Sequence, residues 1–261
     1  MPLTEQTKFL DPDSRRRAIM DHIVQVGAAS VGELAKLLGV STMTIYRDTA
    51  ELEQAELLSR KRGIISAAES SLTEASSHLR MSVNAEIKQK LAQKAPEYLR
   101  RGQSLMFDDS SSTLPLIPML TNYRPITLIT NAEFVANRAR HLDGVKLLLT
   151  GGEYESWADA YFGDLAEITI SRLQIDTCIM SSTALTATHC YHPNERVARL
   201  KRQMLEVSRE KILLVDSSKF SKSALHQVCA NRDFDLVITD SHVPEEALEA
   251  LEADGVQVEI V

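Results

Sequence analysis

The sequence predicts an α/β protein with a small, mainly helical N-terminal domain and a larger C-terminal domain built on a buried, largely parallel sheet. Two observations carry this prediction. Apolar residues recur at helical spacing in the N-terminal part of the chain. Downstream, short β-rich runs alternate with helix-like stretches, which is typical of a parallel sheet covered by helices. We expect domains over residues 1–66 and 85–261, joined by a linker over residues 67–84.

The first two helices are predicted from apolar spacing and from capping. Apolar side chains recur every three or four positions over residues 15–26, which predicts one helix. The next helix, residues 30–38, begins with Ser-Val-Gly-Glu. There the Ser30 hydroxyl can accept a hydrogen bond from the third backbone N–H of the helix, while Glu33 reaches back to the backbone of Ser30.

Gly39 and Ser41 predict a steep turn into a third helix. Glycine adopts the left-handed conformation that lets two helices cross at a short turn, and serine is a favoured first residue of a helix. We expect Ile45, Ala50 and Leu52 to face the core. The two helices and their turn predict a helix-turn-helix, a motif that binds duplex DNA.

A two-stranded wing is predicted after the third helix. Two short extended runs, residues 57–60 and 64–66, flank the loop 61–63. Together with the helix pair they predict a winged helix-turn-helix. The segment 67–84 that follows is rich in Ser and Ala and has no core pattern, so we expect a linker that is helical only in part.

The third helix carries side chains suited to the major groove of DNA. That groove admits one α-helix, whose first turns contact base edges. The predicted DNA contacts are Ser41, Thr42, Thr44, Tyr46, Arg47 and, in the wing, Arg62. The guanidinium of Arg47 can donate two hydrogen bonds to a guanine or a phosphate. The alternative is a winged helix that binds another protein, with Arg47 paired to Asp48 or Glu51 on the surface.

Charge and cysteine content are those of a reduced, cytoplasmic regulator. The net charge is −7, yet the first 66 residues hold nine Lys and Arg against nine Asp and Glu, so the acidic excess lies downstream. The cysteines are odd in number and scattered, at positions 178, 190 and 229. No apolar run reaches the ~18 residues that span a membrane, and the N-terminus lacks a signal-peptide pattern, so we expect no membrane partner.

The C-terminal domain is predicted to begin with a helix over residues 85–100, followed by seven strands. The strands are 104–109, 126–130, 145–150, 175–180, 211–216, 234–239 and 256–261. Because ligands bind outside the carboxyl ends of parallel strands, polar and glycine residues at these ends are candidate contacts.

Four of the strand ends carry polar or glycine residues of this kind. Two lysines of the same domain can supply positive charge. The predicted effector contacts are Asp109, Ser110, Ser111, Ser112, Thr113, Asn131, Gly151, Gly152, Lys201 and Lys219. Hydroxyls and backbone N–H groups at a strand-to-helix turn can cradle an anion, which predicts a phosphorylated small molecule. Each feature alone also fits a helix cap, a turn or a solvated lysine; their joint placement favours a pocket.

The order of these motifs resembles the DeoR family of transcriptional regulators, from about Ser14 to Val261. The segment VGELAKLLGVSTMTIYRDTAELEQAELLSRKRG is similar to the family's helix-turn-helix. DDSSST, LITN, LLLTGGEY, LKRQM and LLVDSSKF match, in order, its C-terminal sensor domain, which is related to ribose-5-phosphate isomerase and glucosamine-6-phosphate deaminase. The chain has Tyr46 where the family usually has arginine, and Ser111, Ser181 and Ala184 where it tends to have glycine.

The resemblance implies a sequence-specific regulator, a repressor of a carbohydrate catabolism operon, that binds double-stranded operator DNA and is controlled by a phosphorylated sugar. It also implies a homodimer or homotetramer, since palindromic operators mirror protein symmetry. We expect no cofactor, no metal and no enzymatic activity.

Two alternatives remain open. One is an isomerase or deaminase fused to a DNA-binding head, with Asp109, Glu153, Asp176 or His189 as a general base. The other is a metal site at residues 189–192, His-Cys-Tyr-His, although we expect this segment to be a loop lining the effector pocket.

Overall fold

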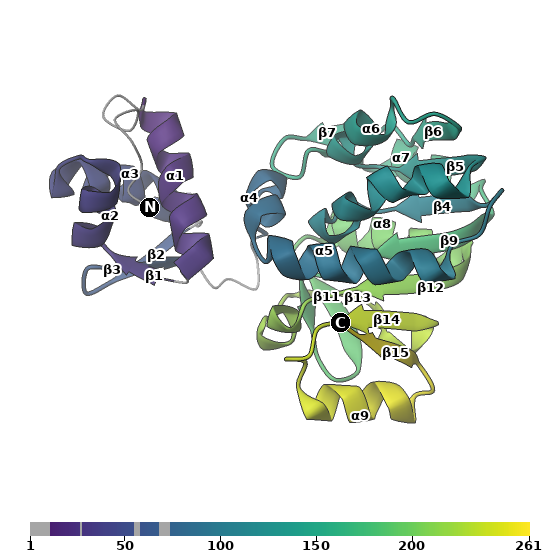
Figure 1. Cartoon of the computed structure of the whole chain (residues 1–261). Helices are drawn as coiled ribbons and strands as arrows, with labels where there is room; N and C mark the ends of the chain where they lie inside the picture. The colour runs from purple at the N-terminus through teal and green to yellow at the C-terminus, as the bar shows by residue number, and fades with distance from the viewer. Residues whose placement is uncertain (1–10, 27, 55–57, 68–73) are drawn as a thin grey trace. The chain divides into compact units, whose positions relative to one another are not determined.

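A computed structural model describes residues 11–26, 28–54, 58–67 and 74–261 of the chain. It divides into two compact units, Met1–Val83 and Asn84–Val261 (Figure 1). Among the described residues, no helix is long and apolar enough to cross a membrane.

The N-terminal unit packs helices against a small antiparallel sheet with strand order β1-β3-β2. Its elements are α1 (Pro12–Val26), β1 (Ala28–Ser30), α2 (Val31–Leu38), α3 (Thr42–Gln54), β2 (Leu58–Lys61), β3 (Ile64–Ala67) and α4 (Ser77–Ser82). Strands β2 and β3 form the predicted wing, although the predicted first residue, Leu57, lies outside the described residues. Strand β1 was not predicted, because three residues are too few to show a strand pattern.

Hydrogen bonds confirm the two predicted helix caps, and the backbone angle of Gly39 confirms the predicted turn. The Ser30 hydroxyl accepts a hydrogen bond from the Glu33 N–H at 3.2 Å, and the Glu33 carboxylate accepts from the Ser30 N–H at 2.7 Å. Gly39 has φ of 65°, in the left-handed region. The Ser41 hydroxyl accepts from the Thr44 N–H at 3.1 Å. Two of the three sequence signals, the cap of α2 at Ser30 and the cap of α3 at Ser41, therefore act through hydrogen bonds.

One core prediction for α3 is wrong. Ile45 and Leu52 are buried as expected, but Ala50 is exposed. Thr49 takes the inward position instead, and its hydroxyl donates to the Ile45 carbonyl oxygen at 2.7 Å. A threonine can face the core of a helix in this way because its hydroxyl is satisfied by the preceding turn.

The C-terminal unit is built on a seven-stranded parallel sheet with order β15-β14-β12-β9-β4-β5-β6. Its strands are β4 (Ser104–Phe107), β5 (Ile126–Thr130), β6 (Val145–Leu149), β9 (Ile175–Met180), β12 (Ser208–Leu214), β14 (Leu236–Thr239) and β15 (Gln257–Ile260). All seven predicted strands are present. The α/β fold class is thus confirmed, with β12 beginning three residues before its predicted start.

Helices connect these strands. They are α5 (Ala85–Lys94), α6 (Glu133–Ala139), α7 (Asp164–Ser171), α8 (Glu195–Glu206) and α9 (Glu245–Ala253), with 3-10 helices η2 (Ala95–Tyr98), η3 (Ser111–Tyr123), η4 (Ser217–Ser221) and η5 (Asn231–Asp233). The predicted helix over 85–100 is α-helical only to Lys94. Pro96 lacks the N–H that would continue the hydrogen bonds, and the chain goes on as η2.

Two small antiparallel pieces were not predicted. One is the hairpin of β7 (Glu153–Glu155) and β8 (Ala160–Phe162); the other is a sheet of β10 (Ala184–Leu185), β11 (His189–His192) and β13 (His226–Ala230). Residues 189–192, expected to be a loop, therefore form a strand. Cys190 and His192 are buried, whereas His189 and Tyr191 are half-buried on the other side of the strand.

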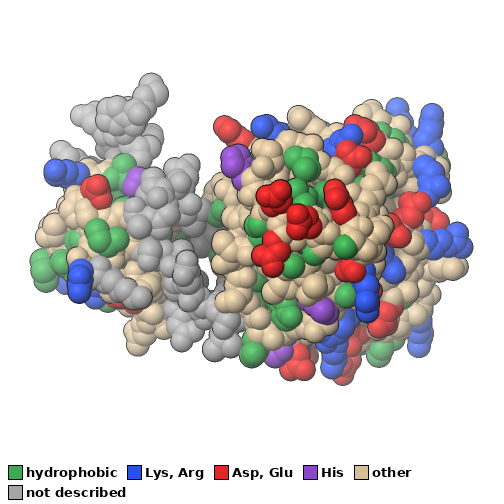
Figure 2. Space-filling view, turned by 90° about the horizontal axis from the view of Figure 1, so that it is seen from below, with side chains coloured by type: hydrophobic (Ala, Val, Ile, Leu, Met, Phe, Trp, Pro, Cys, Tyr) green, Lys and Arg blue, Asp and Glu red, His purple; other side chains and the backbone are tan. Residues whose placement is uncertain are grey.

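Acidic side chains gather on one face of the C-terminal unit. Figure 2 shows this face from below, where red side chains cover the region of α9. Within α9, Glu245, Glu246, Glu249 and Glu252 are all exposed. The acidic excess predicted downstream of residue 66 is therefore partly concentrated here, where it repels nucleic acid.

Candidate DNA-binding and effector sites

The exposed face of α3 carries most of the predicted DNA contacts. Thr42, Tyr46 and Arg47 are exposed, and Thr44 is half-buried. Arg62 is exposed at the turn of the wing, with φ of 53°. Ser41 is exposed too, but its hydroxyl already bonds to the Thr44 N–H and lies 2.9 Å from the Thr44 hydroxyl.

Arg47 keeps its charge unpaired in the part of the chain that the structure describes. The two carboxylates that could neutralise it contact other arginines. Asp48 is buried and accepts hydrogen bonds from Arg15, one of them at 3.1 Å, and Glu51 pairs with Arg16. Arg47, which is predicted to contact DNA, is thus available. Arg15 and Arg16, both on α1, pair with carboxylates of α3 and so hold these two helices together.

The wing contacts α3 through a stacked arginine. The guanidinium carbon of Arg60 lies 5.0 Å from the centre of the Tyr46 ring, within cation–π distance. Glu53 fixes Arg60 twice, with an ion pair at 2.9 Å and a hydrogen bond from the Arg60 N–H at 2.9 Å. The sequence analysis missed this contact, because nothing in the spacing of these residues marks it.

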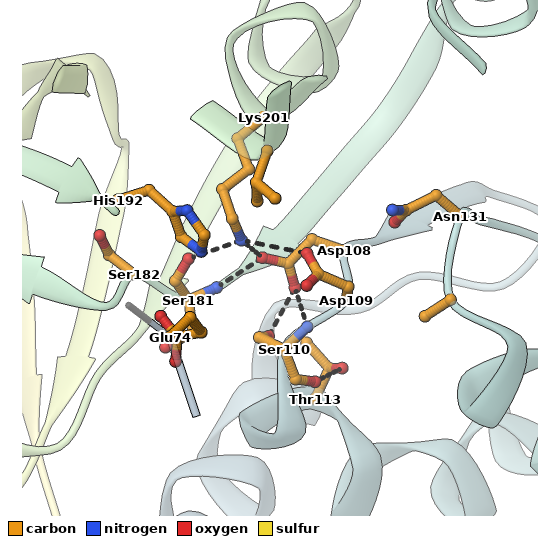
Figure 3. A network of polar contacts seen from close by, with 12 residues as sticks. Glu74, Asp108, Asp109, Ser110, Thr113, Asn131, Ser181, Ser182, His192 and Lys201 are labelled. Carbon is orange, nitrogen blue, oxygen red and sulfur yellow. Dashed lines mark hydrogen bonds and ion pairs between the residues drawn. The ribbon is translucent and has the colours of Figure 1, made fainter. Parts of the chain in front are cut away.

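The strand order gathers the predicted effector residues at one edge of the sheet. The loops after β4, β5, β6, β9 and β12 leave neighbouring parallel strands at their carboxyl ends. Residues 108–113, after β4, are all buried. Figure 3 shows this network from close by, with Asp108 at its centre and Asn131 to one side.

Asp108 and Lys201 form the buried centre of the site. The Lys201 ammonium pairs with one Asp108 oxygen, lies 3.7 Å from a carboxylate oxygen of Asp109, and donates to the Ser181 carbonyl oxygen at 3.2 Å. Asp108 also accepts from the Ser110 N–H at 3.1 Å and the Ser181 N–H at 3.2 Å. Lys201 is thus bound to carboxylates, and Asp108, absent from the predicted contacts, organises the edge.

A second buried cation, Lys88, was missed by the sequence analysis. It lies on α5, is only 4% exposed, and its ammonium donates to the Ser111 hydroxyl at 2.8 Å. A signal was available: Lys88 lies three, four and seven positions before Leu91, Ala92 and Ala95, on the apolar face of the helix. A lysine on such a face is a candidate for a buried polar site.

Other hydroxyls of the loop after β4 bond within the loop or to Ser181, which follows β9. Ser112 donates to the Ser181 hydroxyl at 3.4 Å, and Thr113 donates to the Ser110 carbonyl oxygen at 2.9 Å. Ser111, which stands where the family tends to have glycine, uses its hydroxyl to bind Lys88. Its departure from the pattern therefore adds an acceptor to the site.

Asn131 presents an acceptor at the same edge. The side chain is fully buried after β5, and its amide donates to the Tyr161 carbonyl oxygen at 3.1 Å. Its Oδ1 atom has no hydrogen-bond partner among the described residues. A buried acceptor without a donor costs free energy, which a ligand hydroxyl or amine can recover.

The remaining predicted contacts follow two other strands of the sheet, β6 and β12. Gly151 and Gly152 follow β6, and a Cβ at Gly152 would lie 2.5 Å from the Phe162 carbonyl oxygen, so this glycine permits a close approach to β8. Lys219 lies in η4 after β12, two strands from β4 in the sheet order.

The candidate general bases of the enzyme alternative do not converge. Asp176 is the second residue of β9, at the end of the sheet opposite Asp109, and hydrogen bonds from the Ser104 N–H and hydroxyl hold its pKa below the usual value. Glu153 pairs with Arg196, and His189 lies on β11 beside Thr188. The described residues also contain no group of three His, Cys, Asp or Glu able to hold a metal ion.

A surface cavity of about 440 Å³ lies away from the strand ends, between α8 and β13. Its lining includes His189, Arg202, Lys211 and Arg232. None of the predicted effector contacts lines it. The cavity is thus separate from the polar network of Figure 3.

Comparison with known protein families identifies both units. Residues 15–71 match the DeoR-like helix-turn-helix domain, and residues 83–241 match the DeoR C-terminal sensor domain. The chain belongs to the DeoR family. The winged helix-turn-helix of this DeoR-family regulator is therefore a DNA-binding domain, as the sequence predicted.

Relatives of this DeoR-family regulator are named as transcriptional regulators. A protein of Escherichia coli O157:H7 named as an aga operon transcriptional repressor is 32% identical over 254 residues, covering 95% of this chain and 93% of that protein. The L-fucose operon activator of Haemophilus influenzae is 32% identical over 232 residues, covering 88% and 93%. These names agree with a regulator rather than an isomerase or deaminase.

One solved structure similar to the DeoR-family regulator is ribose 5-phosphate isomerase A from Methanocaldococcus jannaschii. The identity is 14% and the TM-score 0.39, and the match covers 52% of this chain and 55% of that chain.

Proposed function

We propose that this regulator represses a carbohydrate catabolism operon by binding operator DNA through α3 and the wing. The unpaired Arg47 on the exposed face of α3 carries this assignment. Base edges would contact Thr42, Tyr46 and Arg47, while Arg62 would reach a phosphate or the minor groove. The relatives named for the aga and fucose operons support control of sugar use; the first is named as a repressor and the second as an activator.

The test of the DNA assignment is Arg47→Ala, with Arg17→Ala as the matched control. Arg17 is exposed on α1, outside α3 and the wing. An operator is first selected from a pool of random duplexes with the full chain. Binding at one fixed salt concentration should fall for Arg47→Ala by at least tenfold and change little for Arg17→Ala. Equal affinity of the wild type and Arg47→Ala would reject α3 as the reading element.

The proposed effector is a phosphorylated sugar bound at the carboxyl end of the sheet. The Ser111 hydroxyl and the N–H groups of residues 111–113, together with Lys88, offer donors for a phosphate. Asp109 and Asn131 offer acceptors for sugar hydroxyls. Because residues 108–113 are buried, a ligand reaches them only if part of the chain around them moves. Effector binding is thereby tied to a conformational change, which is what control of DNA binding requires.

A thermal-shift panel tests the effector class. Sugar phosphates are compared with the corresponding free sugars and with inorganic phosphate, since a ligand that binds the native state at 100 times its Kd stabilises it by about 2.7 kcal/mol. A sugar phosphate should raise the melting temperature where the free sugar and phosphate do not. Stabilisation by the free sugar to the same extent would reject a phosphate site.

Two further features belong to the same proposal. A palindromic operator is matched by a symmetric homodimer or homotetramer, and light scattering with and without operator duplex tests it. A monomer on a single half-site would contradict it. The regulator would act in the cytoplasm, where bacterial operator DNA is accessible; fluorescence microscopy of a tagged chain checks this location.

A further inference from the structure

Met43 is the most exposed of the large apolar side chains in the described residues, at 72%. It lies in the first turn of α3. The core-facing side of α3 is formed by other residues, Ile45, Asp48, Thr49 and Leu52. Met43 therefore contributes little to the stability of the unit, and a methionine side chain that faces water gains nothing there.

The position of Met43 is that of a base-reading residue. Tyr46 and Arg47 follow it by three and four positions, so the three side chains lie on one face of the helix. In helix-turn-helix proteins, the N-terminal residues of the second helix contact base edges. The sequence analysis named Thr42 and Thr44 on either side of Met43 and passed over the methionine.

The chemistry of Met43 restricts what it can read. A thioether donates no hydrogen bond and accepts only weakly, so it cannot pair with the polar edge of a base. In the major groove, thymine alone among the four bases presents a methyl group. An unbranched, adaptable side chain such as methionine is well suited to cover that methyl group.

The neighbouring ring is held in place. Tyr46 lies under the guanidinium of Arg60, which Glu53 fixes by an ion pair and a backbone hydrogen bond. Tyr46 is 40% exposed, so part of its ring faces outward beside the turn that carries Met43. An apolar strip thus runs along the face of α3, next to the charged Arg47.

We propose that Met43 determines operator specificity by packing on the methyl group of a thymine in each half-site. The proposal rests on α3 being the reading helix. The proposal predicts that this chain prefers thymine at one position of the operator half-site. A polar residue at position 43 of the protein would favour a different base there.

The test replaces thymine by deoxyuridine, which removes only the methyl group. Each thymine of the selected operator is replaced in turn, in both half-sites, and binding to the full chain is measured at fixed salt. For the wild type, one position per half-site should lose about fourfold in affinity, the equivalent of burying a single methyl group. At that position Met43→Ala should bind the thymine and deoxyuridine operators equally well.

Two further variants make the outcome decisive. Gln54→Ala changes an exposed residue in the last turn of α3, three turns from Met43, and should keep the full deoxyuridine penalty. If Met43→Ala also keeps the penalty, or if no deoxyuridine weakens the wild type, Met43 does not read thymine. Should Arg47→Ala bind as well as the wild type, the reading helix itself is wrongly assigned, which is a different failure.

Discussion

At the scale of single residues, four buried ionisable side chains lie at or next to the loop after β4. Asp108, Asp109, Lys88 and Lys201 are each at most 4% exposed, and their formal charges sum to zero. A buried ion costs several kcal/mol unless it is paired and hydrogen-bonded, so these groups stabilise the fold only as a set. An effector phosphate would bring further negative charge to these groups. We therefore expect its binding to change the contacts of the two lysines and the position of the loop.

The first prediction concerns Lys201. Replacing it by methionine keeps most of the side-chain volume but leaves Asp108 and Asp109 buried without their ammonium partner. We expect Lys201→Met to lower the free energy of unfolding of the C-terminal unit by about 3–5 kcal/mol, the usual result of breaking a buried pair. Chemical denaturation followed by circular dichroism measures it.

The control for Lys201→Met is Lys222→Met, at an exposed position after η4. It should change stability by less than about 0.5 kcal/mol. Adding Asp108→Asn to Lys201→Met should restore part of the lost stability, because the uncompensated charge is removed. A Lys201→Met protein as stable as the wild type would show that the pair does not hold the edge together.

At the scale of elements, the sequence predicts what depends on local patterns and fails where distant residues meet. The seven parallel strands were predictable because each contains a short run rich in aliphatic and β-branched residues, and the cap at Ser30 because its partner lies three residues on. The strands β7 and β10 are too short to show a pattern. Lys201 and Asp108 lie 93 positions apart, so their pairing comes from the sheet order alone. For the same reason, the sequence analysis predicted that Lys201 contacts the effector and did not predict its ion pair with Asp108.

The second prediction concerns the link between the wing and α3. Arg60 stacks on Tyr46, and we expect it to orient that ring for DNA. Arg60→Leu should weaken operator binding about three- to tenfold while costing no more than about 1 kcal/mol in stability, since the pair with Glu53 is only part-buried. Gel-shift titrations and thermal denaturation measure the two quantities.

The salt dependence separates orientation from a direct phosphate contact. If Arg60 contacted a phosphate, Arg60→Leu would reduce the slope of log affinity against log salt by about one. If it orients Tyr46, the slope stays unchanged and the variant has no further effect in a Tyr46→Ala background. A reduced slope, or additive losses in the double variant, would contradict the orienting role.

At the scale of the whole molecule, the proposed DNA contacts and the proposed effector contacts belong to different compact units. No shared residue can therefore account for regulation. The control must be a coupling free energy between two sites, carried by conformations that bind operator and effector unequally. Such coupling has typical values of about 1–3 kcal/mol, or about 5- to 150-fold in affinity.

The third prediction follows from this coupling and from thermodynamics alone. If a saturating effector lowers operator affinity by some factor, a saturating operator duplex must lower effector affinity by the same factor. Calorimetry of the effector with and without operator, and fluorescence anisotropy of the operator with and without effector, give the two factors at one salt concentration.

Arg47→Ala should bind the effector as the wild type does in the absence of DNA, because Arg47 lies in the other unit. At the operator concentration that saturates the wild type, the effector affinity of Arg47→Ala should change less, because less of this variant is bound to DNA. Unequal factors would mean that one of the two titrations was not at equilibrium or was made on a different assembly, and a factor of one would reject that sugar phosphate as the effector.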